Sequence, residues 1–251
     1  ACRHDGGSWM KTPPKLSVNI NKLATLRNAR GGNNPNILAS ALKCEQYGAQ
    51  GITVHPRPDE RHIRFSDVAE LAQHITTEFN IEGYPSNDFI EMVLKYRPAQ
   101  VTLVPDPPHV LTSNNGWDCI AQGEFLKPII DTFKTAGIRT SIFLNPDTEQ
   151  VKAAQQTGTD RIELYTEMFA SAYENGDKNG ILPYVAAAEE AQKCTLGLNA
   201  GHDLSLENLS FFSQEIPGLL EVSIGHALVC DALWYGMENA IRMYRRCLET
   251  P

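Results

Sequence analysis

Short apolar runs alternate along the chain with longer stretches of helical or polar pattern, and most of the short runs end in a polar residue. Spacing and composition predict strands at 16–19, 51–55, 79–83, 101–104, 138–144, 161–166, 194–200 and 219–224. Helices are predicted at about 35–47, 66–78, 85–96, 119–136, 147–157, 181–193 and 205–213, with a last helix ending near 248. The polar stretch 21–34 and the stretch through Gly176 and Gly180 are predicted as loops.

Eight strand–helix alternations without a low-complexity linker predict an α/β fold, a single (β/α)8 TIM barrel with extra helical segments over residues 10–251. The alternative is a doubly wound open sheet. That fold would want a G-x-G-x-x-G turn after the first strand, and the sequence has none. In a parallel barrel every strand ends at the same face, so polar residues that follow different strands converge there.

The composition narrows the class of partner. Of the 251 residues, 42% are hydrophobic and 21% are charged, which suits a globular chain with a substantial core. The formal net charge of −8 argues against a nucleic-acid or anionic-membrane partner. No apolar run approaches the ~20 residues that span a bilayer. Any anion site must therefore be a local basic pocket.

The cysteines indicate the cellular compartment, and the first residues indicate where the natural chain starts. None of the six cysteines forms a C-x-x-C pair and no H-E-x-x-H occurs, so we expect free thiols, a cytoplasmic location and no metal site. Residues 1–9 are polar and are interpreted as an appended tail, with the natural start near Met10.

Two strand ends carry candidate acid–base groups. His55 closes the run Gly51-Ile52-Thr53-Val54 just before a proline, and imidazole can accept a proton near neutral pH. Glu82 closes another buried run, where a lone carboxylate is costly unless it is paired or used. The alternatives are a histidine satisfied by a neighbouring carbonyl, and a salt bridge between Glu82 and an arginine of the same rim.

Two glycine–histidine pairs follow the last two predicted strands. They are Gly201-His202 and Gly225-His226, and in each case a helix is predicted shortly afterwards. Free N–H groups at a helix start favour a phosphate, and in barrels the loops after strands seven and eight often hold one. The alternative is that these glycines serve tight turns alone.

The densest basic grouping lies after the first two predicted strands. Its members are Arg27, Arg30, Arg57, Arg61 and Arg64. Arginine forks suit phosphate oxygens, although rim arginines can equally pair with nearby carboxylates. Pairing is the favoured interpretation for Arg61 and Arg64. A ligand role is favoured for Arg30, which precedes two glycines.

Several of these motifs together resemble the pyridoxine 5′-phosphate synthase family. They occur in family order and at nearly family spacing, from about residue 16 to the last helix. The matching stretches are 25–31 (Thr-Leu-Arg-Asn-Ala-Arg-Gly), 51–55 with Arg57 and 61–63, 80–82 (Asn-Ile-Glu), 199–202 (Asn-Ala-Gly-His) and 224–227 (Ile-Gly-His-Ala).

The resemblance implies a (β/α)8 barrel that assembles into homo-octamers and needs no metal or organic cofactor. It also implies condensation of 3-amino-2-oxopropyl phosphate with 1-deoxy-D-xylulose 5-phosphate. By motif, His55 and Glu82 resemble proton acceptors and His202 resembles a proton donor. Contacts to the amino-ketone phosphate are implied for Asn19, Arg30, Gly225 and His226. Contacts to the deoxyxylulose phosphate are implied for Arg57, His62 and Thr112.

Two departures from the family pattern concern further substrate contacts. The family often has Asp-His where this chain has Asn21-Lys22, and often Gly where it has Asp203. The first change removes a carboxylate and an imidazole and adds an ammonium group. The second places a carboxylate where a phosphate is expected.

Two other functions remain open from the sequence. Another barrel enzyme acting on sugar phosphates is one, although an aldolase would want an interior strand lysine and a metal epimerase would want strand-end aspartates. A non-catalytic binder of phosphorylated metabolites is the other, with Asn21-Lys22 marking lost activity. The presence of His55, Glu82 and His202 speaks against it.

Overall fold

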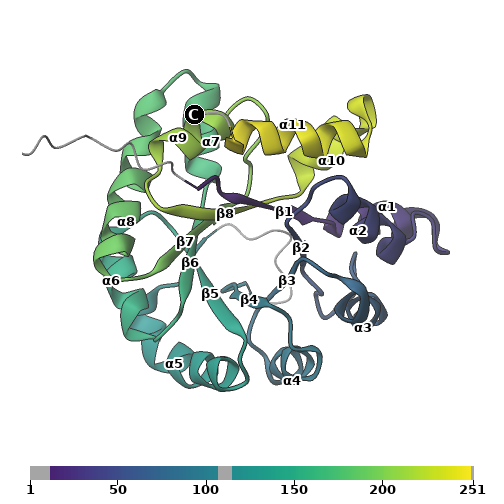
Figure 1. Cartoon of the computed structure of the whole chain (residues 1–251). Helices are drawn as coiled ribbons and strands as arrows, with labels where there is room; N and C mark the ends of the chain where they lie inside the picture. The colour runs from purple at the N-terminus through teal and green to yellow at the C-terminus, as the bar shows by residue number, and fades with distance from the viewer. Residues whose placement is uncertain (1–11, 107–114, 250–251) are drawn as a thin grey trace, which may run out of the picture.

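The computed structural model describes residues 12–106 and 115–249. Within these residues, eight parallel strands pair in chain order and close into a barrel, which confirms the predicted fold (Figure 1). The strands are β1 Lys15–Asn19, β2 Gly51–Val54, β3 Glu78–Gly83, β4 Gln100–Leu103, β5 Arg139–Leu144, β6 Arg161–Tyr165, β7 Gly197–Gly201 and β8 Leu219–Ile224.

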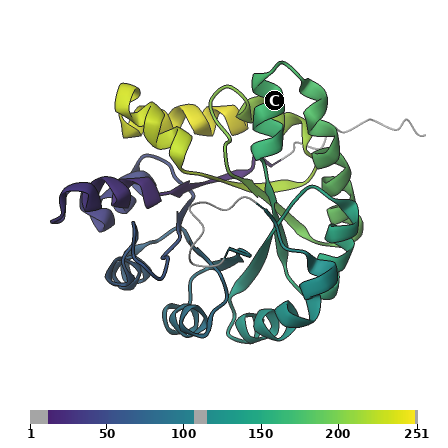
Figure 2. The same ribbon diagram turned by 180° about the vertical axis from the view of Figure 1, so that it is seen from behind.

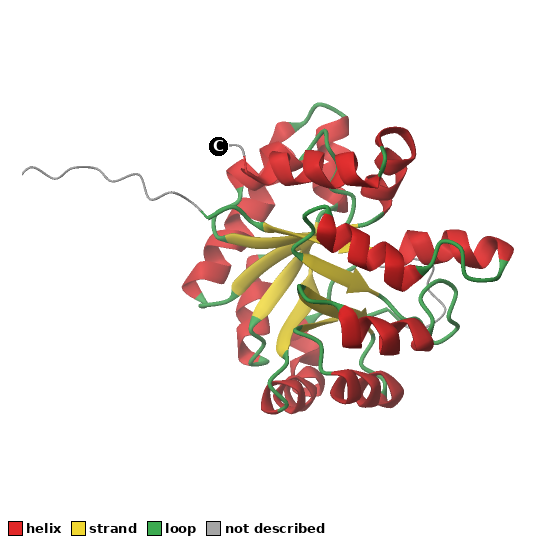
Figure 3. Cartoon of the chain, turned by 45° about the vertical axis from the view of Figure 1, so that its right-hand side comes forward, coloured by secondary structure: helices red, strands yellow, loops and turns green. Residues whose placement is uncertain are grey.

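Helices surround the strands on the outside of the barrel, as the views from behind and from the side also show (Figures 2 and 3). They are α1 Asn21–Arg30, α2 Ile37–Gln46, α3 Phe65–His74, α4 Asn87–Tyr96, α5 Cys119–Thr135, α6 Thr148–Gln156, α7 Glu167–Glu174, the 3-10 helix η1 Lys178–Ile181, α8 Leu182–Lys193, α9 Leu209–Glu215, α10 His226–Tyr235 and α11 Met237–Glu249.

Three predictions of local structure were wrong. The supposed loop 21–34 contains helix α1, whose buried face consists of Leu23, Ala24 and Arg27. An arginine is normally expected on the exposed face of a helix, so Arg27 breaks the amphipathic pattern by which a helix is predicted. Its burial depends on a partner elsewhere in the chain. The supposed loop before η1 contains α7, which buries Phe169. The single last helix is in fact two, separated at Gly236 with φ of 78°.

The strands alternate between apolar residues that pack beneath the helices and polar residues that fill the barrel. Ser17 and Thr53 share a hydrogen bond of 2.7 Å, and the Asn80 amide donates to the Thr53 hydroxyl at 3.2 Å. Thr102 in turn donates to Asn80 Oδ1 at 3.0 Å. Side-chain hydrogen bonds therefore connect β1, β2, β3 and β4 across the interior, in place of layers of branched apolar residues.

Two sequence predictions lie outside the described residues: the appended tail 1–9 and the substrate contact Thr112. In the part of the chain that is described, no helix has the length and apolar character needed to cross a membrane.

Candidate active site

A cavity of about 460 Å³ opens where the carboxyl ends of the strands meet. Most of the candidate residues line it although they come from distant parts of the sequence. Those that line it are Asn19, Asn21, Lys22, His55, Arg57, His62, Glu82, His202, Asp203, Gly225 and His226. Arg30 differs, because it ends α1 as an exposed residue and does not belong to the described lining.

Backbone and amide contacts fix the rim between β8, β1 and β2. The Asn21 N–H donates to Asn19 Oδ1 at 3.0 Å, and the His55 N–H donates to Asn21 Oδ1 at 2.9 Å. Gly225 packs so closely on β1 that a Cβ there would lie 3.0 Å from the Asn19 Cβ. The glycine thus lets the turn after β8 approach β1, and α10 begins with the next residue, His226.

The two histidines of the β2 rim lie among positive charges. The His55 and His62 rings are 6.4 Å apart between centroids. Burial, followed by the charge of Arg57, lowers the pKa of His55 well below its usual value, so this imidazole is neutral and can accept a proton. The same causes lower the pKa of His62 to about 4. The His62 Nδ1 accepts from the Ile63 N–H at 2.8 Å, which leaves the His62 proton on Nε2.

A buried ion pair holds His62 and its loop in place. The Arg27 Nη1 and Nη2 atoms lie 2.6 and 2.9 Å from the Asp67 carboxylate oxygens. Arg27 Nη2 and the Asn28 amide both donate to the His62 carbonyl, at 3.0 and 2.8 Å. Asp67 also accepts from the Arg64 N–H at the start of α3. Arg27 is therefore a structural clamp between α1 and α3 and has no direct place in the cavity lining.

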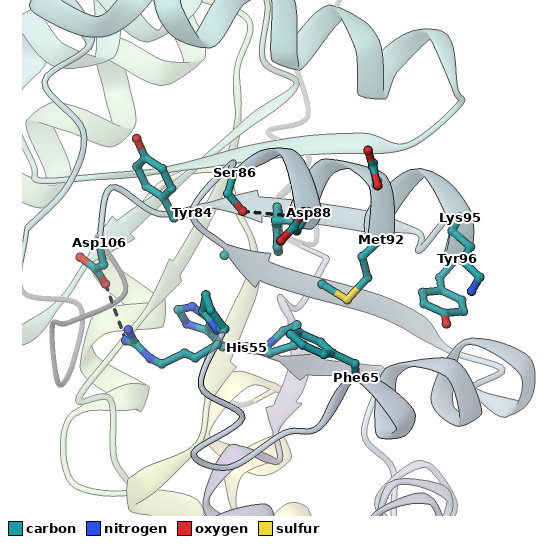
Figure 4. Close-up of a pocket in the computed structure, with 15 residues that line it drawn as sticks. His55, Phe65, Tyr84, Ser86, Asp88, Met92, Lys95, Tyr96 and Asp106 are labelled. Carbon is teal, nitrogen blue, oxygen red and sulfur yellow. Dashed lines mark hydrogen bonds and ion pairs between the residues drawn. The ribbon is translucent and has the colours of Figure 1, made fainter.

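The remaining rim arginines differ in their partners. Arg61 pairs with Asp59 at 2.8 Å, as the sequence suggested, and it also lines the cavity. Arg57 lies 3.9 Å from Asp106, and both side chains are buried. Figure 4 shows this ion pair at the inner end of a second cavity.

The second cavity, of about 510 Å³, extends outward from the barrel mouth between α3 and α4 (Figure 4). His55 and Arg57 line both cavities, so they form part of the wall between them. The aromatic and apolar side chains in its lining include Phe65, Tyr84, Phe89, Met92 and Tyr96.

Carboxyl groups from β3 and β6 also line the first cavity. Burial raises the pKa of Glu82 on β3 to about 7, although the charges of His202 and Arg57 work against this rise. Glu163 on β6 also lines the cavity. Burial and the neighbouring charges of Glu82 and Glu221 raise the pKa of Glu163 well above its usual value. The two carboxyl groups interact, so the ionisation of one disfavours the ionisation of the other.

Glu163 is a site residue that the sequence analysis missed. Its signal was available, since Glu163 stands between Ile162 and Leu164 in a predicted buried strand. Glu163 lies in the middle of β6, whereas the other acid–base candidates were predicted at strand ends. A Cβ at Gly201 on the neighbouring strand β7 would lie 2.4 Å from Glu163 Oε1, so the glycine makes room for this carboxyl group.

His202 follows β7 in a sharply turned backbone. Its φ is 79°, and that of Asp203 is 59°. The His202 ring meets the Tyr165 ring edge to face at 4.8 Å. Its Nδ1 lies 2.5 Å from Asp203 Oδ2. Asp203, which the sequence suggests as a substrate contact, lines the cavity, and its carboxylate contacts the imidazole.

Comparison with known proteins places these observations in a family. Residues 16–250 match the family model described as pyridoxal phosphate biosynthesis protein PdxJ. The chain is 59% identical over 235 residues to pyridoxine 5′-phosphate synthase of Flavobacterium johnsoniae, covering 94% of this chain and 99% of that protein. It is 59% identical over 234 residues to the synthase of the same name in Bacteroides fragilis, covering 93% and 99%.

Solved structures of much lower identity share the fold. A 3-hexulose-6-phosphate synthase from Salmonella typhimurium has a TM-score of 0.64 at 11% identity, covering 93% of this chain and 98% of that chain. A tryptophan synthase from Mycobacterium tuberculosis has a TM-score of 0.63 at 11% identity, with coverages of 95% and 94%. These similarities concern the barrel alone.

Proposed function

The chain belongs to the PdxJ family of pyridoxal phosphate biosynthesis proteins, and we propose that its barrel mouth carries out the reaction for which the relatives are named. This pyridoxine 5′-phosphate synthase reaction condenses 3-amino-2-oxopropyl phosphate with 1-deoxy-D-xylulose 5-phosphate. The products are pyridoxine 5′-phosphate, inorganic phosphate and water. The amine attacks a ketone, a phosphate leaves, and a carbanion-like carbon closes the ring, so protons must move at several steps.

One observation carries the proposal: a carboxyl group with a pKa of about 7, Glu82, shares one cavity with the neutral imidazole of His55. A general base works best when its pKa lies near the operating pH. Glu82 and His55 then act as the two proton acceptors and His202 as the proton donor. Glu163, whose pKa is raised well above its usual value, donates a hydrogen bond in its protonated form to an oxygen of the substrate or intermediate.

Two sides of the cavity support binding of the two phosphate groups. Arg57, Arg61 and Lys22 bring positive charge to the rim, and His62 offers its Nε2–H. Across the mouth, α10 begins at His226, where unpaired backbone N–H groups and the helix dipole favour an anion. Asn19 and Gly225 lie beside this turn and complete the amino-ketone phosphate contact.

The test of the function is product formation from the two purified substrates. Pyridoxine 5′-phosphate and inorganic phosphate are expected in equal amounts, and omission of either substrate abolishes both. Glu82→Gln serves as the matched control for contaminating activity. Binding of both substrates without turnover would overturn the enzymatic proposal and favour a non-catalytic binder.

The family resemblance also leads us to propose a homo-octamer in the cytoplasm. An exposed apolar group on α10, Leu233, Trp234 and Tyr235, supports burial against another copy of the chain. The cysteines at 44, 119, 194, 230 and 247 are free thiols, which suits a reducing compartment. Light scattering on the purified protein measures the assembly, and a monomer at micromolar concentration would contradict it.

A further inference from the structure

The contact between His202 and Asp203 has the geometry of an imidazole oriented by a carboxylate. The Nδ1–Oδ2 distance is 2.5 Å. The hydrogen bond from His202 lowers the pKa of Asp203 below its usual value, so the carboxylate is ionised and accepts the bond. With Nδ1 held in this way, Nε2 is the ring nitrogen left for a ligand in the cavity that His202 lines.

Neighbouring contacts hold the turn that makes this pairing possible. Positive φ angles are unfavourable for residues other than glycine, although aspartate tolerates them better than most. The Thr166 hydroxyl donates to the Gly201 carbonyl at 2.8 Å and also contacts the His202 carbonyl. The Asn208 amide donates to the Asp203 carbonyl at 3.2 Å. The backbone is thus fixed on both sides of the pair, and the two side chains turn toward each other.

We propose that Asp203 is a positioning residue for His202, which keeps a proton on Nδ1 so that Nε2 is the nitrogen that exchanges protons with the substrate. In the donating step the Nε2–H bond breaks and its electron pair stays on the ring. The proton forms an O–H bond on the leaving oxygen of the substrate as the C–O bond breaks and its electron pair moves to that oxygen, and the ring becomes the neutral Nδ1–H form hydrogen-bonded to Asp203. This inference rests on the proposed function, because it assigns Asp203 to the same proton donor.

The contact that Asp203 makes with His202 favours a positioning role over a direct contact with substrate. An anionic carboxylate facing a substrate phosphate would repel it. A carboxylate already engaged by an imidazole places its charge where the ring's positive charge can offset it. The titratable groups near the pair are Glu82 on β3 and His226 on α10, Glu163 on β6 lines the same cavity, and Tyr165 packs against the ring.

The kinetic test compares Asp203→Asn and Asp203→Gly with the parent enzyme. Asparagine keeps the shape but can donate to Nδ1 and favour the other tautomer, whereas glycine relieves the positive φ and removes the carboxylate. We expect kcat to fall about 10- to 100-fold in both variants, with each KM within about threefold and a larger solvent isotope effect. Glu207→Gln removes a carboxylate from the same loop and is expected to leave kcat unchanged.

Parental kcat in both variants would overturn the proposal, and so would a raised KM with unchanged kcat, which would make Asp203 a substrate contact. A second measurement does not depend on turnover. In protein labelled with ¹⁵N-histidine, His202 signals are identified by their loss in His202→Gln. At a pH where the ring is neutral, the proton is expected on Nδ1. A neutral ring protonated on Nε2 would overturn the proposal even if the parent enzyme makes product, and the Nδ1–H form would support it even if the proposed reaction fails.

Discussion

His55 and His202 are the same side chain at the ends of two barrel strands, β2 and β7, yet their surroundings differ in sign. His55 is buried beside Arg57 and Arg61, whose charges help to lower its pKa well below the usual value. His202 instead contacts the Asp203 carboxylate and lies near enough to Glu82 for its charge to affect the pKa of that group. Position at a strand end brings each histidine to the barrel mouth, and the two histidines differ in the charge of the side chains that they meet there.

The same division extends across the mouth of the barrel. The β1–β2 side carries positive charge and hydrogen-bond donors, and it is held by the Arg27–Asp67 pair. Strands β3 and β6 and the turn after β7 contribute carboxyl groups, of which Glu82 and Glu163 have raised pKa values. Burial favours the uncharged form of both acceptors: it lowers the pKa of His55, with help from the charges of Arg57 and Arg61, and it raises the pKa of Glu82 to about 7.

The largest effect on turnover is expected from Glu82→Gln, which keeps the shape and removes the acceptor. We expect kcat to fall about 10²–10⁴-fold with little change in either KM. Because burial disfavours the Glu82 charge, the variant should unfold at the same or a higher temperature than the parent at pH 8. A raised KM with unchanged kcat would mean that Glu82 only binds substrate.

His55→Ala removes the acceptor on the cationic side. We expect turnover to fall about 10²-fold, with circular dichroism showing an intact fold. The loss should persist from pH 7 to pH 9, because His55 is already neutral throughout that range. Near-normal turnover by the alanine variant would mean that His55 is not a proton acceptor in the reaction and that Glu82 alone has this role.

The pH profile of kcat/KM should show the ionisation of Glu82. Glu82 must be ionised to accept a proton and its pKa is about 7, so kcat/KM should rise about tenfold per pH unit below pH 7 and level off above it. The apparent pKa belongs to the interacting Glu82–Glu163 pair. Glu163→Gln removes one potential charge from the pair and should shift the rise to lower pH. A profile that is flat between pH 5.5 and 8 would contradict this assignment.

Breaking the clamp behind the cationic side should affect binding more than chemistry. Arg27→Met leaves the Asp67 carboxylate buried without its ion pair, which costs about 3–5 kcal/mol of stability. It also frees the His62 loop, so we expect the KM for the deoxyxylulose substrate to rise about tenfold. Thermal unfolding and kinetics on the double variant Arg27→Met/Asp67→Asn separate the two effects, because stability should partly recover while KM stays high. Recovery of KM in the double variant would contradict a positioning role.

The smallest effect is expected at Lys22, an exposed residue of the cavity rim. Lys22→Met should raise KM about threefold for one of the two phosphorylated substrates, since a screened rim charge contributes little. Lys22→His should be tolerated better than Lys22→Met. Steady-state kinetics against each substrate in turn provide the measurement. Parental KM values in Lys22→Met would show a solvated surface residue.

The sequence predicted the barrel and most of its mouth because both depend on local pattern. Apolar runs of strand length and polar residues at their ends can be read without knowledge of distant contacts. Helix α1 was missed because its buried face includes Arg27, whose partner Asp67 lies forty residues away. Glu163 is visible in the sequence between Ile162 and Leu164, but its place in the cavity depends on the room that Gly201 of the neighbouring strand provides.

The orientation of Asp203 could not be predicted from the sequence for a different reason. The sequence shows that a carboxylate follows the histidine after the seventh strand. The direction of that carboxylate follows from the positive φ angles at positions 202 and 203. Arg30 shows the converse, since a motif match implied a substrate contact and its side chain is exposed at the end of α1.

The polar interior of the barrel has a consequence for the energetics of the whole fold. Hydration of apolar groups on unfolding raises the heat capacity, and hydration of polar groups lowers it. The serine, threonine, asparagine and glutamate side chains buried inside the strands, such as Ser17, Thr53, Asn80 and Glu221, therefore reduce the heat capacity increment relative to an aliphatic barrel centre. A smaller increment flattens the curve of stability against temperature, so this barrel loses its folding free energy more gradually on either side of its optimum.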